Sequence, residues 1–273
     1  MAHCIVEEAE KILDKEFPVL DHGFVRLVDY LGSDQRIVQA ARVSYGDGTK
    51  SYRQDKGLIN YLLRNDHTSP FEQVVFTFHV KAPIFVARQW VRHRTARMNE
   101  ISGRYSVMKD EVYIPDAGKI ALQSEDNKQG RKNEPVDGET AEKVQGLLRK
   151  NAEETFRVYH ELLDEGIARE ISRINLPLSM YTEFYWEIDL HNLFHFLRLR
   201  LDGHAQYEIR AYAEVMLEMV KAVCPIAAEA FINLKVGSQT FSAHELEALK
   251  AMLSGNEPEL EKREKEIFLS KLK

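Results

Sequence analysis

The stretch from residue 74 to residue 104 reads V-V-F-T-F-H-V-K-A-P-I-F-V-A-R-Q-W-V-R-H-R-T-A-R-M-N-E-I-S-G-R. Its first eight residues alternate between apolar and mixed side chains, which predicts a half-buried strand over 74–81. Pro83 then suits the first turn of a helix that continues to Val91, because a proline there loses no hydrogen bond. We therefore expect a strand that leads into a helix, and a chain that leaves this helix near Arg94.

Five arginines and no lysine occur in the seventeen residues from Arg88 to Arg104, in a chain whose net charge is −6. A guanidinium is a rigid donor fork that pairs bidentately with phosphate or carboxylate, whereas a lysine offers a point charge. Asn99, Ser102 and Gly103 add small polar groups and a flexible backbone whose N–H groups can approach an anion closely. This segment predicts a site for a small phosphorylated ligand.

The flanking sequence alternates helical and strand patterns. Helical periodicity covers 1–16, 33–43, 58–63, 139–166, 189–201 and 205–223, with a helical end over 256–273, and strand patterns cover 24–30, 180–188 and, more weakly, 105–113. The segment 116–138 is polar and has no aromatic residue, which predicts a mobile loop. We expect a main domain over 1–236, with a helical extension at 1–22, and a charged helical tail over 237–273.

Composition limits the class of protein. A chain of 273 residues, 44% of them hydrophobic, can bury a large core without covalent staples. The two cysteines, Cys4 and Cys224, form neither a disulfide framework nor a C-x-x-C pair, which favours a reducing, cytoplasmic setting. No apolar run is long enough to span a bilayer, and the acidic net charge argues against general nucleic-acid binding. We expect a cytoplasmic protein with neither a membrane nor a nucleic-acid partner.

Several residues could have either a structural or a functional role. His191 and His195 lie four positions apart on one helix face, so they could hold a metal ion. The apolar residues between them favour histidines that pack or contact a ligand. We therefore expect no metal site. Cys224 has no neighbour in sequence that would lower the pKa of its thiol, so it is expected in the core. His67, in a polar loop, is equally well a turn residue or a substrate contact.

The arginine-rich segment contains the pattern R-H-R-x-x-x-x-N-E-x-S-x-R-Y over 92–105, which resembles the signature of the flavin-dependent thymidylate synthases. The resemblance extends from about Gly23 to Lys235 through further motifs, which are H-x-S-P at 67–70, F-H-V-K-A-P-I-F-V-A-R-Q-W at 78–90, R-x-x-L-P at 173–177 and F-L-x-L-R at 196–200. The N-terminal helix, the loop 116–138 and the tail beyond about 237 lie outside it.

This resemblance implies an α+β fold in which an antiparallel or mixed sheet packs with long helices. It implies a single-domain protomer that assembles into a homotetramer with shared active sites. It also implies reductive methylation of dUMP to dTMP, with methylenetetrahydrofolate as the carbon donor and with FAD that is reduced by NADPH. In such a reaction the cofactor carries the redox chemistry, and the protein orients and polarises the substrates.

The same resemblance implies roles for individual residues. The dUMP-binding set is Gln89, Trp90, Arg92, Glu100, Ile101, Ser102, Gly103, Arg104, Arg173 and Arg200. The FAD-binding set is Ser69, Arg92, His93, Arg94, Glu100, Asp189, Leu190, His191 and His195. Arg200 would be the catalytic residue, because it would face the uracil, favour ionisation at N3 and raise the electron density at C5. His67 would form a wall for the stacked folate.

Three positions depart from the family pattern. Arg97 stands where members often have serine, His195 where some have asparagine, and Ser69 where threonine is common. These changes are expected to alter binding strength and leave the reaction class unchanged. Two other functions remain open from the residues alone. One is a metal-dependent nucleotide phosphohydrolase that uses His191 and His195, and the other is a nucleic-acid-binding module that uses 88–104.

Overall fold

The computed structural model describes residues 4–43, 52–125 and 129–272, which fall into two compact units, Met1–Phe231 and Ile232–Lys273. Residues 1–3, 126–128 and 273 lie outside the described residues, and they belong to the expected extension 1–22, the loop 116–138 and the tail. The strands of the first unit are β1 (Glu16–Val19), β2 (Gly23–Leu31), β3 (Val75–Pro83), β4 (Arg97–Glu100), β5 (Ala121–Gln123), β6 (Arg131–Pro135) and β7 (Tyr181–Asp189). Its helices are α1 (Glu7–Glu10), α2 (Asp34–Arg42), α3 (Tyr52–Arg64), α4 (Ile84–Trp90), α5 (Gly138–Asp164), α6 (Arg169–Ser172), α7 (Leu190–Arg200), α8 (Tyr207–Val223) and α9 (Pro225–Phe231), with 3-10 turns η2 (Phe71–Gln73), η3 (Ala117–Lys119) and η4 (Arg173–Asn175).

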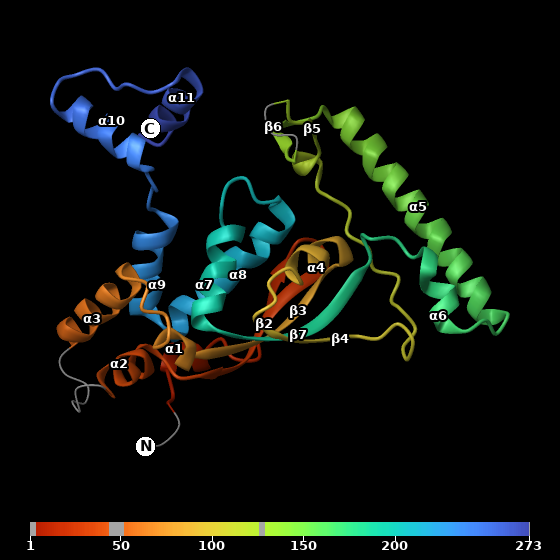
Figure 1. Cartoon of the computed structure of the whole chain (residues 1–273). Coiled ribbons are helices and arrows are strands. Elements are labelled where there is room, and N and C mark those ends of the chain that lie inside the picture. The colour runs from red at the N-terminus through yellow and green to blue at the C-terminus, as the bar shows by residue number, and fades with distance from the viewer. Residues whose placement is uncertain (1–3, 44–51, 126–128, 273) are drawn as a thin grey trace. The chain divides into compact units, whose positions relative to one another are not determined.

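A five-stranded sheet with the order β1-β2-β3-β7-β4 organises the first unit (Figure 1). Each neighbouring pair is antiparallel, which confirms the α+β expectation and selects the antiparallel of the two sheet types. The alternation predicted from sequence is present in β3, where Phe76, Phe78 and Val80 are fully buried. Side chains of alternate residues therefore fill a core on one face of the sheet.

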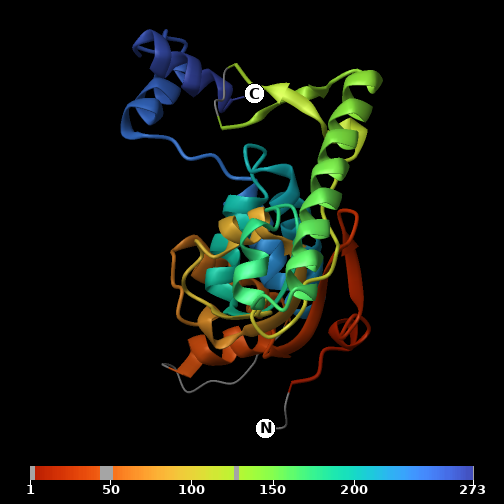
Figure 2. The same ribbon diagram turned by 90° about the vertical axis from the view of Figure 1, so that its right-hand side faces the viewer.

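Helices α4, α7 and α8 lie over that face of the sheet (Figures 1 and 2). The centre of the core is aromatic, because the ring of Trp90 packs within 5.8 Å, between ring centroids, of four other rings, those of Phe184, Trp186, Phe196 and Tyr212. Such ring pairs add to the free energy gained from burial alone. The helix that precedes the arginine segment is thereby fixed to the sheet.

Two strand-to-helix junctions position the elements that follow them. Pro83 ends β3 and is the N-cap of α4, so the predicted helix begins one residue after the proline. Asp189 ends β7 and caps α7, with its side-chain oxygen accepting the backbone N–H of Asn192 at 3.0 Å. This capping satisfies one of the N–H groups that a helix start leaves free, and it lies where the sequence predicted the helix 189–201 to begin.

The N-terminal segment differs from the expected helical extension over 1–22. Its described part contains only the short helix α1, and then β1, which pairs with β2 at the sheet edge. Asp14 and Leu20, on either side of β1, have positive φ angles of 57° and 62°, which a helix does not allow. Pro18 is tolerated in β1 because an edge strand leaves one row of N–H groups unpaired.

Three other segments also differ from the sequence-based expectation. Residues 105–113 form no strand, and only an isolated bridge joins Val112 to Met180. Conversely, the polar residues of β4 pair with β7, although their pattern contains no apolar alternation. The segment 116–138, predicted as a mobile loop, contains η3 and a two-stranded antiparallel pair of β5 with β6. Backbone pairing forms these strands without the side-chain pattern that sequence reasoning relies on.

Helix α5 runs along one side of the first unit and contains an exposed glycine, Gly146 (Figures 1 and 2). A Cβ atom added there would meet no atom within 4 Å. We expect Gly146→Ala to raise the free energy of unfolding by about 0.5–1 kcal/mol, because glycine loses more backbone freedom than alanine in a helix. Denaturant unfolding measures this change. Gly138→Ala, at the first residue of the same helix, is the control with a smaller effect, and an unchanged midpoint for Gly146→Ala would contradict the prediction.

The second unit contains the π-helical turn η5 (Ile232–Val236) and helices α10 (Ala243–Leu253) and α11 (Lys262–Ser270). Ser242 and Glu245 form a reciprocal capping box at the start of α10. Lys271 donates to the Glu245 carboxylate at 2.6 Å, and Phe268 is fully buried. These contacts tie the two helices of the unit together. Across the described residues of both units, no helix is long and apolar enough to cross a bilayer.

Candidate active site

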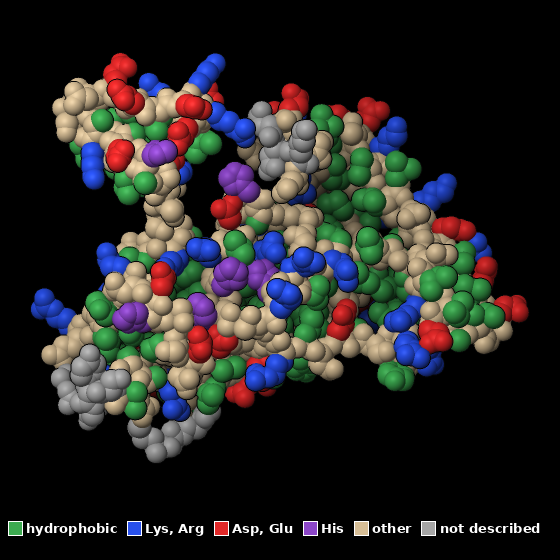
Figure 3. Space-filling view, viewed as in Figure 1, with side chains coloured by type: hydrophobic (Ala, Val, Ile, Leu, Met, Phe, Trp, Pro, Cys, Tyr) green, Lys and Arg blue, Asp and Glu red, His purple; other side chains and the backbone are tan. Residues whose placement is uncertain are grey.

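The arginine-rich segment begins in the last turn of α4 and continues beyond it, and α7 supplies side chains that contact it. The charged end of α4 leads into a turn that contains Arg92, His93 and Arg94. Lysine, arginine and histidine side chains gather on this face of the molecule over α4 and α7 (Figure 3). The clustering predicted from the sequence is therefore present in space as well as along the chain.

Arg200, at the end of α7, joins these two elements. Its Nε donates a hydrogen bond to His93 Nε2 at 3.1 Å, and its Nη2 donates to the Gln89 carbonyl oxygen at 3.3 Å. The guanidinium is half-buried, and burial lowers the pKa of Arg200. An arginine has five N–H donors in a fixed plane, so the donors not used in these two bonds remain for a ligand. The His93 and Gln89 contacts fix the direction in which they point.

His93 is a neutral hydrogen-bond acceptor at neutral pH. Burial, with the nearby charges of Arg200 and His195, lowers the pKa of His93 from 6.5 to about 4. Its ring lies edge-on to Phe196 at 4.8 Å and to His195 at 6.0 Å between centroids. A neutral imidazole has one ring nitrogen that can accept the hydrogen bond from Arg200. An imidazolium has no such nitrogen, because both of its ring nitrogens carry protons.

This arrangement makes the pKa of His93 depend on Arg200. We expect Arg200→Ala to raise the pKa of His93 toward 6.5, although only in part, because burial is the larger cause of the shift. In the unmodified protein the unfolded chain binds a proton below pH 6.5 and the folded one only near 4. The contribution of His93 to stability is therefore present above pH 6.5 and is lost as the pH falls toward 4. Imidazole NMR titration measures the pKa, with Arg198→Ala as the control. An unchanged His93 titration in Arg200→Ala would refute the coupling.

A second group of predicted residues lies around Gly103, which is buried. A Cβ atom added to Gly103 would lie 3.0 Å from Met108 Sδ and 3.1 Å from both Cδ and Nη1 of Arg173. The Ser102 carbonyl accepts the N–H groups of Tyr105 and Ser106, each at 3.1 Å, which closes a turn. The turn therefore lies against the Arg173 side chain, so these two distant motifs are brought together.

Charged residues flank this turn on both sides. Arg104 Nε pairs with the Glu170 carboxylate at 2.9 Å, on the helix α6 that precedes Arg173. On the other side, the Thr182 hydroxyl donates to Glu100 Oε1 at 2.6 Å. Thr182 is buried, so this hydrogen bond fixes one carboxylate oxygen of Glu100. Ile101 is exposed, and its N–H donates to the Glu183 carbonyl of β7 at 2.9 Å.

Of the other predicted residues, His195 joins the first group through its ring contact with His93, and Ser69, His67 and His191 lie outside both groups. Ser69 and His67 are exposed in the loop before η2, where the His67 ring packs edge-on to Tyr61 at 5.7 Å between centroids. His191 is half-buried and His195 exposed on α7. The described residues contain no group of three His, Cys, Asp or Glu side chains that could hold a metal ion.

Two predicted ligand contacts require correction at the level of the side chain. Trp90 and Leu190 are both fully buried in the core, so neither side chain is accessible to a nucleotide or a flavin. Apolar motif residues beside charged ones belong to the packing that holds the site. The Leu190 N–H is also used, because it donates to the Val74 carbonyl at 2.8 Å. Trp90 and Leu190 can therefore contact a ligand only through main-chain atoms other than the Leu190 N–H.

The predicted site is thus divided within one chain. One group contains Gln89, His93, His195 and Arg200, and the other contains Glu100, Ser102, Gly103, Arg104 and Arg173. Within the described ranges, no hydrogen bond or ion pair links the two groups. Sequence reasoning missed Thr182, Glu170 and Gln206. Gln206 accepts a hydrogen bond from the Gln89 side chain. None of the three belongs to a motif, so only their contacts identify them.

Comparison with known proteins assigns the chain to a family. Residues 26–226 match the family model described as thymidylate synthase complementing protein, and residues 240–273 match the thymidylate synthase ThyX C-terminal domain. The chain is 63% identical, over 96% of its length and 98% of the relative's, to the flavin-dependent thymidylate synthase of Treponema denticola. It is 56% identical to that of Treponema pallidum, over 100% of this chain and 90% of the relative's.

A solved structure has the same fold. The UMP/dUMP methylase PolB from Streptomyces cacaoi, bound with 5-Br dUMP, matches with a TM-score of 0.74 and 36% identity, and the match covers 82% of this chain and 100% of that one. Motif, fold and extended sequence identity agree, and the chain belongs to the flavin-dependent thymidylate synthase family.

Proposed function

We propose that this protein catalyses the reductive methylation of dUMP to dTMP, with methylenetetrahydrofolate as the carbon donor and with FAD reduced by NADPH. Family membership supports the reaction class. The observation in this chain that carries the proposal is the half-buried Arg200, which His93 and the Gln89 carbonyl hold in one orientation. A guanidinium fixed beside a uracil stabilises negative charge on the ring, which favours loss of the N3 proton and makes C5 more nucleophilic.

The turn at Gly103 fits the nucleotide. Its backbone approaches the Arg173 side chain so closely that a Cβ atom would fill the space between them. Ser102 and Arg104 extend from the same turn. The Ser102 hydroxyl, the Arg173 guanidinium and the N–H groups of Arg104 that Glu170 does not use are available to phosphate oxygens. Arginine suits this role because its donor fork matches phosphate geometry. These residues hold dUMP, and no thiolate adduct is needed, because Cys224 is fully buried and burial raises the pKa of its thiol.

The residues after α4 fit a phosphate-bearing flavin. Arg92 and Arg94 are exposed, and neither forms a hydrogen bond or ion pair within the part of the chain that the structure describes. FAD, when bound, supplies the hydride chemistry that no side chain can provide. Arg92 and Arg94 bind its phosphates, while His93, His195 and the start of α7 orient it. The exposed His67 contributes to the folate site.

A homotetramer completes the site. The residues that bind dUMP and those that hold Arg200 lie in two groups of one chain, so two chains supply the two halves of each site. Apolar side chains exposed around the Gly103 turn and α6 support this assembly, among them Tyr105 at 81%, Ile174 at 69% and Leu178 at 64% exposure. Exposed apolar surface of this kind marks interaction sites. The C-terminal segment 237–273 is an additional domain of the protomer. The enzyme works in the cytoplasm.

A visible absorption spectrum tests the function most directly. We expect the purified protein to bind FAD, the flavin to bleach when NADPH is added without oxygen, and dUMP to be converted to dTMP when methylenetetrahydrofolate is supplied. Protein that binds no flavin in the presence of FAD and dUMP would overturn the proposal. Flavin that bleaches without forming dTMP would overturn the methylation step alone.

Mixing two inactive variants tests the shared site. We expect Arg173→Ala and Arg200→Ala each to be inactive as homo-oligomers, and a mixture that has exchanged subunits to recover activity. The recovery arises because some sites then receive Arg173 from one chain and Arg200 from the other. Light scattering measures the assembly itself. A mixture that stays inactive after proven subunit exchange would place both arginines of each site in one chain.

A further inference from the structure

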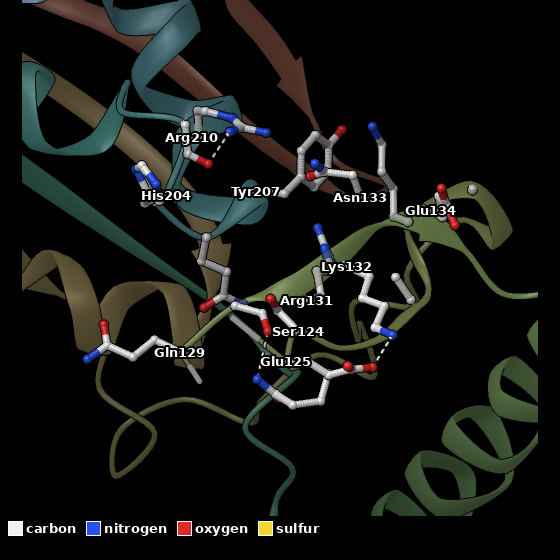
Figure 4. A pocket seen from close by; sticks show the side chains of 18 residues that line it. Ser124, Glu125, Gln129, Arg131, Lys132, Asn133, Glu134, His204, Tyr207 and Arg210 are labelled. Carbon is white, nitrogen blue, oxygen red and sulfur yellow. Dashed lines mark hydrogen bonds and ion pairs between the residues drawn. The ribbon is translucent and has the colours of Figure 1, made fainter. Parts of the chain in front are cut away.

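A cavity outside the two groups lies between the β5–β6 pair and the start of α8 (Figure 4). Its volume is about 1170 Å³, and η3, the two strands and residues 203–207 with Arg210 line it. This volume is slightly above the range of about 300–1,000 Å³ that is typical of sites for small molecules and cofactors. All of these residues belong to the first unit. The cavity is therefore large enough for a substantial part of a nucleotide.

The charged side chains that line the cavity are mainly cationic. They are Lys119, Arg131, Lys132 and Arg210 against Glu125 and Glu134. Lys132 is held by Glu125 at 2.6 Å, so its charge is already neutralised. Arg131 and Arg210 also lie near carboxylates, those of Glu208 at 3.1 Å and Glu214 at 3.8 Å. Lys119 is therefore the lining cation without a carboxylate partner among the described residues, and it is the group that favours an anion.

Two of these cations meet at one aromatic ring. Lys119 Nζ lies 4.1 Å and Arg131 Cζ lies 5.5 Å from the centroid of the Tyr207 ring. Arg131 also donates to the buried Glu208 carboxylate at 3.1 Å, which neutralises one charge. Lys119 forms no ion pair with any carboxylate among the described residues. Lys119 and Arg131 therefore both contact the Tyr207 ring, and the Glu208 carboxylate neutralises one of their two positive charges.

The cavity is adjacent to the candidate active site. Gln206 lines the cavity, and its side-chain oxygen accepts the hydrogen bond from the Gln89 amide. The backbone carbonyl of Gln89 accepts the hydrogen bond from Arg200. One residue therefore separates the cavity from the group that faces the uracil. A ligand that reaches from the flavin site into the cavity would pass Gln206.

We infer that this cavity binds the 2′-phosphate of the nicotinamide dinucleotide that reduces the flavin, with Lys119 and Arg131 as its ligands. This inference rests on the proposed function, which requires such a reductant. A phosphate monoester carries close to two negative charges, so it matches a pair of cations of which one is unbalanced. The compact ammonium of Lys119 and the guanidinium fork of Arg131 supply both kinds of donor. The cavity thereby selects the phosphorylated dinucleotide over the unphosphorylated one.

The test uses the full chain with FAD and saturating dUMP, so that the arginine groups of the active site are filled. Calorimetry measures the binding of 2′,5′-ADP, which carries the 2′-phosphate without the reacting ring. We expect Lys119→Ala to weaken this binding about tenfold, the size of one lost hydrogen bond to a charged group. Lys119→Arg should recover most of it. Lys132→Ala is the matched control, because it removes an equal but already paired charge from the same cavity, and its effect should stay below about twofold.

A kinetic measurement gives the second readout. Anaerobic flavin bleaching should show a higher KM for NADPH in Lys119→Ala, with an unchanged maximal rate and an unchanged KM for NADH. Equal losses with both dinucleotides would overturn the inference, as would 2′,5′-ADP binding that Lys119→Ala leaves intact. Inorganic phosphate that competes as well as 2′,5′-ADP would show a small-anion site only.

Measuring FAD binding, dTMP formation and 2′,5′-ADP binding on the same protein distinguishes this inference from the proposed function. Protein that binds no FAD overturns the proposed function and, with it, the assignment of the cavity to a flavin reductant. Protein that binds FAD and forms dTMP but does not bind 2′,5′-ADP overturns the cavity assignment alone. Binding of 2′,5′-ADP that depends on Lys119, in an enzyme that forms dTMP, supports both.

Discussion

Arg200→Ala is expected to lower kcat for dTMP formation by about a hundred- to a thousandfold, the loss typical when one oriented donor to a developing negative charge is removed. The side chain is half-buried and held by His93 and Gln89, so no neighbouring residue can replace it. Water that enters the vacated space would screen charge and would not restore the fixed direction of the donors.

Two measurements separate this effect from misfolding or from loss of the flavin. The rate of flavin bleaching by NADPH should stay close to that of the unmodified protein, because Arg200 acts on the uracil. Arg198→Ala, which removes an exposed arginine from the same helix, should retain full activity. If the kcat of Arg200→Ala stays within tenfold of that of the unmodified enzyme, Arg200 is not the catalytic residue.

Gly103→Val is expected to lower kcat/KM for dUMP by about a hundredfold, which is the cost that a displacement of about 1 Å can impose on a substrate-positioning group. The first added carbon alone would lie 3.0 Å from Met108 Sδ and 3.1 Å from Arg173. The branched side chain must therefore displace the Arg173 guanidinium or open the turn that carries Ser102 and Arg104.

The flavin site is spared in this variant, because its main residues follow α4 and line α7. Bound FAD and the visible spectrum should be unchanged, while the affinity for dUMP falls. Gly138→Val is the control, since a Cβ atom at Gly138 would meet nothing within 4 Å. Tight dUMP binding in Gly103→Val would mean that the Arg173 side chain is not a phosphate ligand.

Sequence reasoning predicted those parts of the fold that local patterns encode. The strand before Pro83 and the helix that begins at Asp189 were both predicted, because side-chain periodicity acts within a few positions along the chain. The strand β4 was missed because its pattern R-M-N-E is polar, and it pairs with β7 more than eighty residues later in the chain. The edge strand β1 was missed because it contains a proline.

The candidate site shows the same division. The motifs named the residues that come together at Gly103 and Arg173, and at His93 and Arg200. They could not show that Trp90 and Leu190 point into the core, because a motif records residue type and not side-chain direction. Nor could they identify Thr182 or Gln206, which are neutral polar residues whose roles depend on a partner distant in sequence.

The direct junction between β7 and α7 has a consequence for how this family can vary. Asp189 is the last residue of the strand and also the cap of the helix, so no linker separates the two elements. One inserted residue would turn the whole of α7 by about 100° about its axis, given 3.6 residues per turn. Arg200 would then point away from His93. Deletions and insertions should be absent from this junction in functional relatives, even where point substitutions are frequent.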